Sequence, residues 1–337
     1  MAAKKIRVVQ YGCGPIGCRV ASYALERPNI EMVGAIGRTT NVGRDLGEVA
    51  GLGRKLGIII SNNAEEVFAK TKPDVVLHTT SSSLVKIQPE INQIVNAGIN
   101  VVSTTEELSY PWKTQPKISR EIDELAKKKK VTVLATGVNP GFVMDTWPLN
   151  LTAVCKDVKK VRVVRYQDAT TRRGPFQKKI GAGLTLEEFQ KKVDERTLRH
   201  VGLTESIGMI AAGLGWELDD IKETLEPIVA QKEAKSQFVT VKPGQAMGVR
   251  QVGVGLKNGE EIIRLDFEAA VGRGETYDAV YITGTPNLEM VANGGIHGDI
   301  ATAAIAVNAI RRVFDAPPGL LTMKDIPLVT CFIGPVG

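Results

Sequence analysis

The sequence predicts an α/β protein, with a Rossmann-type doubly wound parallel sheet followed by a second α+β domain built on a mostly antiparallel sheet. Three observations predict this fold. A glycine-rich motif typical of dinucleotide-binding proteins follows the first apolar stretch. Strand-like and helix-like segments then alternate through the first half of the chain, and strand-like segments separated by glycine turns fill much of the second half. The 337 residues suffice for two domains.

The glycine motif lies between a predicted strand and a predicted helix. The apolar run 6–11 leads directly into G-x-G-x-x-G, helix-like residues 18–25 follow, and a second apolar strand at 32–36 completes the spacing of a βαβ unit. The glycines permit a tight turn, a close approach of the backbone to a pyrophosphate, and close packing of the helix on the strand. The predicted dinucleotide-binding residues are Gly12, Cys13, Gly14, Pro15, Ile16 and Gly17.

The residues after the second strand indicate which dinucleotide binds. NAD-specific sites usually have Asp or Glu about 20 residues beyond the motif, where it binds the ribose 2′-hydroxyl. This chain has Gly37, Arg38 and Thr39 there, so this segment supplies no acid that would repel a 2′-phosphate. The guanidinium of Arg38 can pair with such a phosphate. We therefore predict NADP(H) as the cofactor, bound by Arg38 and Thr39, and leave use of NAD(H) open.

Three more strands are predicted in the first half, at 75–78, 100–103 and 132–135, with helices at 87–97 and 118–128. Ligands of such sheets bind outside the carboxyl ends of the strands, so the segments that leave these ends carry the chemistry. The predicted cofactor contacts from these segments are His78, Thr79, Thr80 and Asn139.

The pattern changes near residue 150. We predict strands at 158–165, 238–241, 249–256, 262–271 and 279–283, and helices at 186–193, 206–212 and 218–228. A long apolar helix at 299–314 is predicted to return to the nucleotide domain, with His297 before it at the cofactor. The predicted domains are 1–148 for the dinucleotide, 149–296 for substrate and dimerisation, and 297–337 as a returning helix and tail.

Two adjacent carboxylates, Glu106 and Glu107, leave the predicted strand at 100–103. A carboxylate at this strand end is a candidate general acid or base beside the nicotinamide. Two neighbouring side chains cannot both enter one pocket, and the alternative is that one or both of them cap the following turn. We expect Glu106 to be catalytic because it lies closer to the strand end.

Composition excludes several other classes of function. The net charge of +6 suits an anionic cofactor, but the aromatic–basic interleaving of nucleic-acid-binding proteins is missing. The three histidines and four cysteines have no metal-site or disulfide spacing, so we expect no metal and reduced thiols, which favours a cytoplasmic protein. No apolar run reaches the length of a membrane span. An open antiparallel sheet in the second domain favours a homodimer.

Several segments together resemble a known family over essentially the whole chain. They lie at 12–17, 42–47, 105–111, 137–142, 179–184 and 297–299. They are similar to 2,4-diaminopentanoate dehydrogenases and the related native amine dehydrogenases, which share the fold of dihydrodipicolinate reductase. The resemblance implies reductive amination of a ketone with ammonia and a nicotinamide cofactor, or the reverse reaction. It also implies a catalytic glutamate at 106 or 107, and a substrate pocket lined by Phe142 and Trp147. This sequence departs from the expected pattern at Arg38, because strict use of NAD would call for an acidic residue there.

Two other functions stay open. One is an imine reductase like dihydrodipicolinate reductase, although the chain lacks the paired-histidine, lysine-bearing segment of that family. The other is a non-catalytic NADP(H)-sensing protein. The natural substrate, 2-amino-4-oxopentanoate or another ketone, is not specified by the sequence. An amino-acid substrate would need a cationic anchor, and the candidates for it are Arg165, Arg172, Arg173 and Arg199.

Overall fold

The computed structural model describes residues 5–331 and 333. The chain divides into two compact units, the first formed by residues 1–142 and 297–337 and the second by residues 143–296. Helix α6 (Thr146–Thr152), whose first residues the sequence analysis assigned to the nucleotide domain, thus belongs to the second unit. None of the described helices combines the length and the apolar character needed to span a bilayer.

The first unit contains a parallel seven-stranded sheet in the order β15-β6-β5-β4-β1-β2-β3. The strands are β1 (Ile6–Tyr11), β2 (Ile30–Ile36), β3 (Ile60–Ser61), β4 (Val75–His78), β5 (Asn100–Ser103), β6 (Thr132–Ala135) and β15 (Gly319–Leu321). The strand order reverses at β1, which pairs with β2 on one side and β4 on the other. This confirms the predicted doubly wound sheet, and its two short edge strands β3 and β15 are additions to the prediction.

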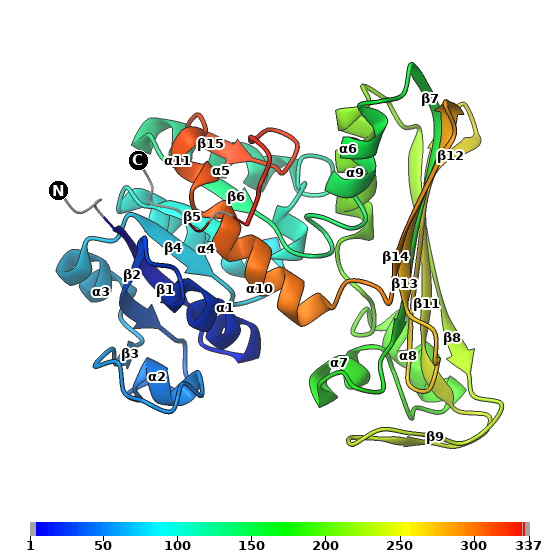
Figure 1. The fold of residues 1–337 in the computed structure, drawn as a ribbon, viewed down its shortest axis with the longest axis horizontal. Helices are drawn as coiled ribbons and strands as arrows, with labels where there is room; N and C mark the ends of the chain where they lie inside the picture. The colour runs from blue at the N-terminus through cyan, green and yellow to red at the C-terminus, as the bar shows by residue number, and fades with distance from the viewer. Residues whose placement is uncertain (1–4, 332, 334–337) are drawn as a thin grey trace. The chain divides into compact units, whose positions relative to one another are not determined.

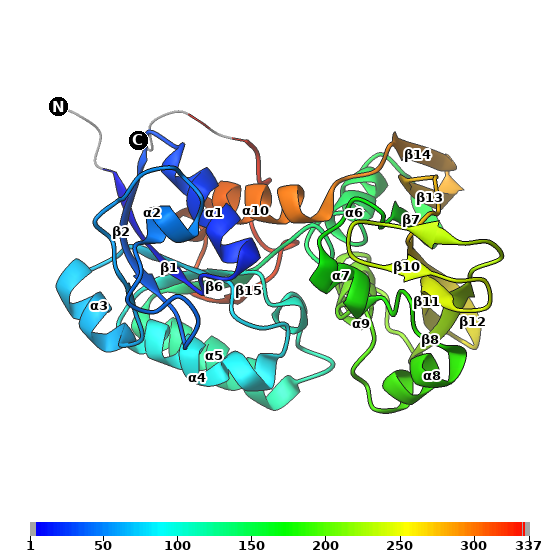
Figure 2. The same ribbon diagram turned by 90° about the horizontal axis from the view of Figure 1, so that it is seen from below.

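Helices cover both faces of this sheet (Figure 2). Helices α1 (Pro15–Leu25) and α10 (Gly298–Ala309) pack together on one face, and α4 (Leu84–Asn96) and α5 (Pro116–Lys129) pack together on the other. The remaining helices of this unit are α2 (Leu46–Val49), α3 (Ala64–Thr71), the 3₁₀ turn η1 (Glu106–Leu108) and α11 (Arg312–Asp315). The predicted helix at 299–314 is therefore two helices, α10 and α11.

Helix α4 shows how the sequence builds this core. Its apolar residues recur at helical spacing, and Leu84, Ile87, Ile91 and Ile94 are all fully buried. Each such side chain contributes about 1.5–3 kcal/mol of burial free energy. Glu90 is a carboxylate on the same buried face, at helical spacing from Ile87.

The second unit is built on a six-stranded mixed sheet in the order β14-β13-β7-β12-β11-β8. Its strands are β7 (Asp157–Asp168), β8 (Asp220–Val229), β11 (Ala246–Lys257), β12 (Glu260–Ala270), β13 (Tyr277–Thr285) and β14 (Leu288–Asn293), beside a small pair of β9 (Ala234–Lys235) and β10 (Thr240–Val241). Only β7 and β12 pair in parallel in the larger sheet, and the other pairs are antiparallel. The predicted, mostly antiparallel second domain is thus confirmed.

One face of this sheet is covered by α6 and α9 (Leu203–Gly213) (Figure 1). Helix α9 approaches closely because β11 has glycines beneath it: a Cβ added to Gly253 would lie 2.9 Å from a side-chain carbon of Ile207. The other two helices of this unit are α7 (Gly174–Lys179) and α8 (Leu186–Asp194).

The predicted helix at 218–228 is wrong, because these residues form strand β8. Their Glu and Lys content favours a helix. The chain there also contains β-branched residues and Pro227, which would remove a hydrogen bond from a helix interior. Pairing with β11 along the whole length of β8 decides the outcome. The predicted strand at 238–241 is likewise reduced to the two residues of β10.

Candidate functional site

The three glycines after β1 perform three different structural tasks. Gly12 has a φ of +99°, and a Cβ there would lie 2.6 Å from the carbonyl oxygen of Thr79. A Cβ on Gly17 would lie 1.8 Å from the carbonyl oxygen of Gly12, so α1 packs directly on the turn. Gly14 is exposed, and a Cβ there would meet nothing within 4 Å. The turn is closed on the protein side and open in front of Gly14, as a pyrophosphate requires.

Side chains from neighbouring segments hold the carbonyl groups of this turn. Gln10 Nε2 and Thr79 Oγ1 both donate to the carbonyl oxygen of Gly12, at 3.0 and 2.8 Å. Asn41 Nδ2 donates to the carbonyl oxygen of Cys13 at 3.0 Å. Because these acceptors are already bonded, the turn can present the N-terminus of α1 to an anion. These residues therefore fit a dinucleotide phosphate.

The other motif residues have different exposures. The Cys13 side chain is buried, and burial raises its pKa to about 12, so only its backbone is suited to bind a ligand. Pro15 is exposed at the first position of α1, and Ile16 is half-buried. Thr39 is exposed beyond β2.

Arg38 lies beyond the end of β2, and it contacts a carboxylate that the sequence analysis missed. Its Nε donates to Oε1 of Glu90, on α4, at 2.6 Å. The expectation that no acid lies beside Arg38 holds for the segment after β2 but not for the folded chain. The sequence feature that could have revealed Glu90 is an acidic residue at a position where the apolar pattern of an amphipathic helix predicts burial.

Glu90 begins a buried polar network across the carboxyl ends of three strands. Its Oε2 accepts from Thr80 Oγ1 at 2.6 Å and lies 2.9 Å from His78 Nε2. The other ring nitrogen of His78 lies 3.0 Å from Ser103 Oγ, which in turn bonds to Thr105. Burial alone would raise the pKa of Glu90, but hydrogen bonds from His78, Arg38 and Thr80 outweigh it and lower the pKa to about 2.

His78 is fully buried, so its ring supports the strand ends from inside and only its backbone is in a position to meet a ligand. Thr79, next to it, contacts the glycine turn, as described above. The polar residues at these strand ends are thus largely bonded to one another, and their predicted contacts with the cofactor remain predictions.

Glu107 is the second of the two adjacent glutamates. Glu107 Oε2 accepts from the backbone N–H of Leu84 at 2.8 Å, so it caps the N-terminus of α4 from outside that helix. Ser83, the N-cap residue of α4, makes no side-chain cap bond of its own. The carboxylate of Glu107 also lies at the positive end of the helix dipole. Glu107 therefore has a structural task.

Glu106 is half-buried at the start of η1, directly after the carboxyl end of β5. Its carbonyl oxygen accepts from the backbone N–H and the hydroxyl of Ser109, at 3.1 and 2.7 Å. Thr105, on its other side, is tied to Ser103 and to the carbonyl oxygen of Ser81. The backbone on both sides of Glu106 is thus fixed, which suits a group that must be held in position.

The loop after β6 contains a buried amide. Asn139 is 7% exposed, and neither its Nδ2 nor its Oδ1 has a hydrogen-bond partner within the part of the chain that the structure describes. Thr302, on α10, accepts from the N–H of Val138 in the same loop at 3.2 Å. A buried amide of this kind is costly unless a ligand satisfies it, so Asn139 fits the carboxamide of a nicotinamide. His297 is the exposed N-cap residue of α10, and Phe142 is half-buried.

The second unit contains a cluster of basic residues around His200. Arg165 is buried and pairs with Asp278 at 3.0 Å, and the guanidinium of Arg172, also buried, lies over the ring of Phe176. Burial, followed by the charges of Lys179, Arg165 and Arg172, lowers the pKa of His200 well below its usual value. The ring of His200 is thus acted on by three positive charges, and its buried Nδ1 has no hydrogen-bond partner among the described residues. Trp147 is half-buried on α6, in this same unit.

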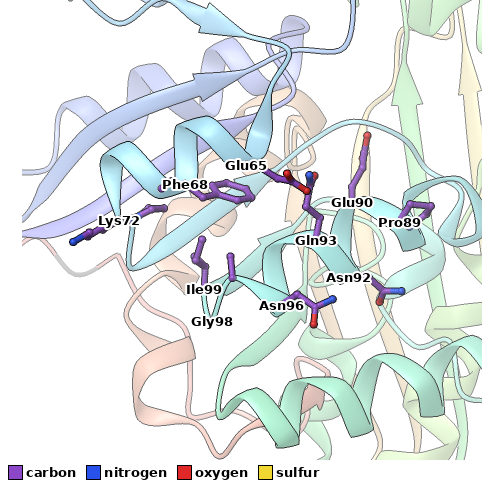
Figure 3. Close-up of a pocket in the computed structure, with 13 residues that line it drawn as sticks. Glu65, Phe68, Lys72, Pro89, Glu90, Asn92, Gln93, Asn96, Gly98 and Ile99 are labelled. Atoms are coloured by element: carbon purple, nitrogen blue, oxygen red, sulfur yellow. The ribbon is translucent and has the colours of Figure 1, made fainter.

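A groove of about 830 Å³ on the first unit lies between α3 and α4 (Figure 3). The residues that line it include Pro73, Gly98 and Ile99, which precede β4 and β5. It thus approaches the amino ends of the strands, whereas ligands of such sheets bind at the carboxyl ends. We do not assign the cofactor to it. Among the described residues no group of three His, Cys, Asp or Glu side chains could hold a metal ion.

Comparisons with known proteins agree along the chain. Residues 142–337 match the family described as the 2,4-diaminopentanoate dehydrogenase C-terminal domain, and residues 6–137 match the N-terminus of dihydrodipicolinate reductase. A 2,4-diaminopentanoate dehydrogenase of Acetoanaerobium sticklandii is 36% identical, over 98% of this chain and 96% of its own. An amine dehydrogenase of Streptomyces virginiae is 26% identical, over 96% of both chains. The structure of an amine dehydrogenase from Mycobacterium smegmatis has a TM-score of 0.86 and 28% identity, covering 96% of this chain and 97% of its own.

The open space at Gly14 and the closed space at Gly17 give a matched test of the dinucleotide site. Gly14→Ala should leave stability nearly unchanged but weaken dinucleotide binding about tenfold or more, because the added methyl group occupies the space for the phosphate. Gly17→Ala should lower the free energy of unfolding by about 3 kcal/mol or more, because its methyl group overlaps a backbone carbonyl. Denaturant unfolding and fluorescence titration measure these effects. Unchanged dinucleotide affinity in Gly14→Ala would refute the assignment.

Proposed function

This chain belongs to the 2,4-diaminopentanoate dehydrogenase family, a family of oxidoreductases, and we propose that it catalyses the NAD(P)H-dependent reductive amination of a ketone with ammonia and the reverse oxidative deamination. The single observation that carries the proposal is the position of Glu106 and Glu107. They leave a central strand of the cofactor-binding sheet, and one of them is already used as a helix cap. The proposed cofactor is NADP(H), with NAD(H) also used.

The proposed chemistry assigns a proton-transfer role to Glu106. Ammonia adds to the carbonyl carbon, and once solvent has protonated the oxyanion the adduct carries an ammonium nitrogen and a hydroxyl. The nitrogen must lose one proton, which gives the hemiaminal, and the hydroxyl must gain one before it departs as water. A carboxylate held at one point can perform both transfers in turn. Loss of water leaves an iminium carbon, and the nicotinamide, when bound, supplies the hydride that reduces it. The fixed backbone around Glu106 would hold the carboxylate at the reacting nitrogen.

Asn139 is proposed to orient the nicotinamide ring by binding the carboxamide of the nicotinamide. The side-chain amide of Asn139 is buried and has a donor atom and an acceptor atom without partners among the described residues. Phe142 and Trp147 are proposed to line the substrate pocket. Apolar rings beside the iminium carbon would exclude the water that hydrolyses it.

The second unit supports a substrate that carries a carboxylate. The positive charges of Lys179, Arg165 and Arg172 all act on the buried ring of His200, and a buried anion gains more from such charges than an exposed one. Among the arginines our candidate for the carboxylate is Arg172, because it is buried and its Nε has no hydrogen-bond partner among the described residues. We therefore propose a γ-keto α-amino acid of the 2-amino-4-oxopentanoate type as substrate.

The two alternative functions fit less well. Against an imine reductase of the dihydrodipicolinate type, residues 142–337 match the 2,4-diaminopentanoate dehydrogenase C-terminal domain, whereas the match to dihydrodipicolinate reductase covers residues 6–137. A non-catalytic sensor would not need a carboxylate fixed at the end of β5. NADPH oxidation with a ketone, with and without ammonium, separates the three functions. Amine dehydrogenation requires both compounds, an imine reductase acts on a preformed imine without ammonium, and a sensor oxidises no NADPH.

Glu106→Gln should bind NADPH normally and lose turnover by about 10²–10⁴-fold, the usual contribution of general acid–base catalysis. Glu107→Gln is the matched control and should keep turnover within about threefold, because the Gln oxygen can still accept from Leu84 and cap α4. Steady-state kinetics with saturating ammonium measure both variants. If both remain fully active, neither glutamate transfers the proton, and if only Glu107→Gln is inactive, the roles are reversed.

Arg172→Gln should raise KM for a γ-keto α-amino acid by about 10- to 100-fold, the range of a lost charge-assisted hydrogen bond, and leave KM for a simple ketone unchanged. Arg173→Gln, one residue further on and only half-buried, is the control and should change neither. Equal effects of Arg172→Gln on the two ketones would show that Arg172 does not bind the carboxylate.

Trp147→Ala should admit bulkier ketones, because removal of the indole ring vacates volume beside the substrate carbon. The ratio of kcat/KM for a branched ketone to that for 2-pentanone should rise about tenfold or more, with the denaturation midpoint checked in parallel. An unchanged ratio in a folded variant would place Trp147 outside the pocket.

A further inference from the structure

Glu90 is a carboxylate near the carboxyl ends of the parallel sheet that is bonded through both of its oxygens. It lies on α4, its side chain is 11% exposed, and each of its two oxygens has separate partners. Oε1 accepts from Arg38, and Oε2 is bonded by Thr80 and lies next to His78. Figure 3 shows the Glu90 side chain extending away from Asn92 and Asn96, which line the groove beside α4.

The contact with Arg38 uses only one nitrogen of the guanidinium. Within residues 5–331 and 333, the bond to Glu90 is made by Nε, and the two terminal nitrogens make no hydrogen bond. The Arg38 side chain is 48% exposed, so the terminal nitrogens remain open to a ligand. A guanidinium held in this way keeps the edge that binds a phosphate through two parallel hydrogen bonds.

The network behind Glu90 makes it a rigid anchor. The ring of His78 is fully buried and is bonded on its far side to Ser103, at the end of β5. A free arginine at a strand end loses rotamer freedom when it binds a phosphate, which costs about 0.5–1.5 kcal/mol per immobilised side chain. An arginine that is already held by a buried carboxylate has lost that freedom before the ligand arrives.

We propose that Glu90 is a positioning residue that sets the choice between NADP(H) and NAD(H), by holding Nε of Arg38 so that the terminal nitrogens face the ribose 2′-phosphate. The inference rests on the proposed function, in which Arg38 binds this end of the cofactor. It goes further by assigning the preference to a pair of residues, one from the segment after β2 and one from α4. A neutral 2′-hydroxyl gains little from the orientation of Arg38, so Glu90 acts on NADPH and hardly on NADH.

The carboxylate of Glu90 could also have the opposite effect and weaken NADPH binding. A negative charge near a 2′-phosphate repels it, and in that case removal of Glu90 would strengthen NADPH binding. We favour positioning because both oxygens of Glu90 accept hydrogen bonds from groups on the protein side and because Arg38 lies on one of them.

The test measures the dissociation constants of NADPH and NADH for the full chain by calorimetric titration, without turnover. Glu90→Ala should weaken NADPH binding about 3- to 10-fold and change NADH binding less than about twofold. Glu90→Gln keeps an acceptor for Arg38 and should restore NADPH affinity to within about twofold of the unmodified chain or better. In an Arg38→Ala background, Glu90→Ala should have no further effect on the ratio of the two constants, because a positioning residue acts only through its partner.

Ser103→Ala is the matched control. It removes the bond on the far side of His78 and leaves the Arg38–Glu90 pair intact, so it should lower stability without moving the ratio. Equal weakening of both cofactors by Glu90→Ala, stronger NADPH binding, or an undiminished effect in the Arg38→Ala background would each overturn the inference. If Glu90→Ala binds both cofactors normally and the ratio of the NADPH and NADH dissociation constants is unchanged, only this inference is contradicted. If the unmodified chain binds neither dinucleotide, the proposed function is contradicted as well.

Discussion

The contact between the turn after β1 and the segment after β4 is the constraint on which the cofactor site depends. These strands are neighbours where the strand order of the sheet reverses, and there the backbone of Gly12 lies so close to Thr79 that no side chain fits between them. The same closeness lets α1 pack on the turn through Gly17 and leaves Gly14 open. The crevice of a doubly wound sheet forms at such a reversal, so one local packing constraint places the phosphate site.

The strand ends around this crevice use their polar residues in two ways. Glu107, Glu90 and His78 are bonded to other protein groups, and they hold α4, Arg38 and the β5 end in place. Glu106 directly follows the end of β5, and Asn139 lies in the loop after the neighbouring strand β6. The backbone on both sides of Glu106 is held by hydrogen bonds, which is the arrangement that precise proton transfer requires.

Much of the fold was predictable, because its signals are local. The glycine motif, the spacing to β2 and the fully apolar strands specify the parallel sheet, and turns such as Asn258-Gly259 mark the hairpins of the second one. Strand β8 was missed because its composition favours a helix and only pairing with β11 overrides that preference. Glu90 was missed for a similar reason: its partner Arg38 is far away in the sequence, and only the packing of α4 beside the end of β2 brings the two together. The distinction between the two glutamates likewise depends on Leu84, a residue from another helix.

The central claim is that this chain joins ammonia nitrogen to a carbonyl carbon and delivers a hydride to that same carbon. The most direct measurement supplies ¹⁵N-ammonium, 2-amino-4-oxopentanoate and NADPH deuterated at C4 on the transferring face, and analyses the product by mass spectrometry and NMR. The account predicts a diamine that carries one ¹⁵N and one deuterium on the former carbonyl carbon. A deuterated alcohol without ¹⁵N, or consumption of a preformed cyclic imine with no incorporation of labelled nitrogen, would contradict it.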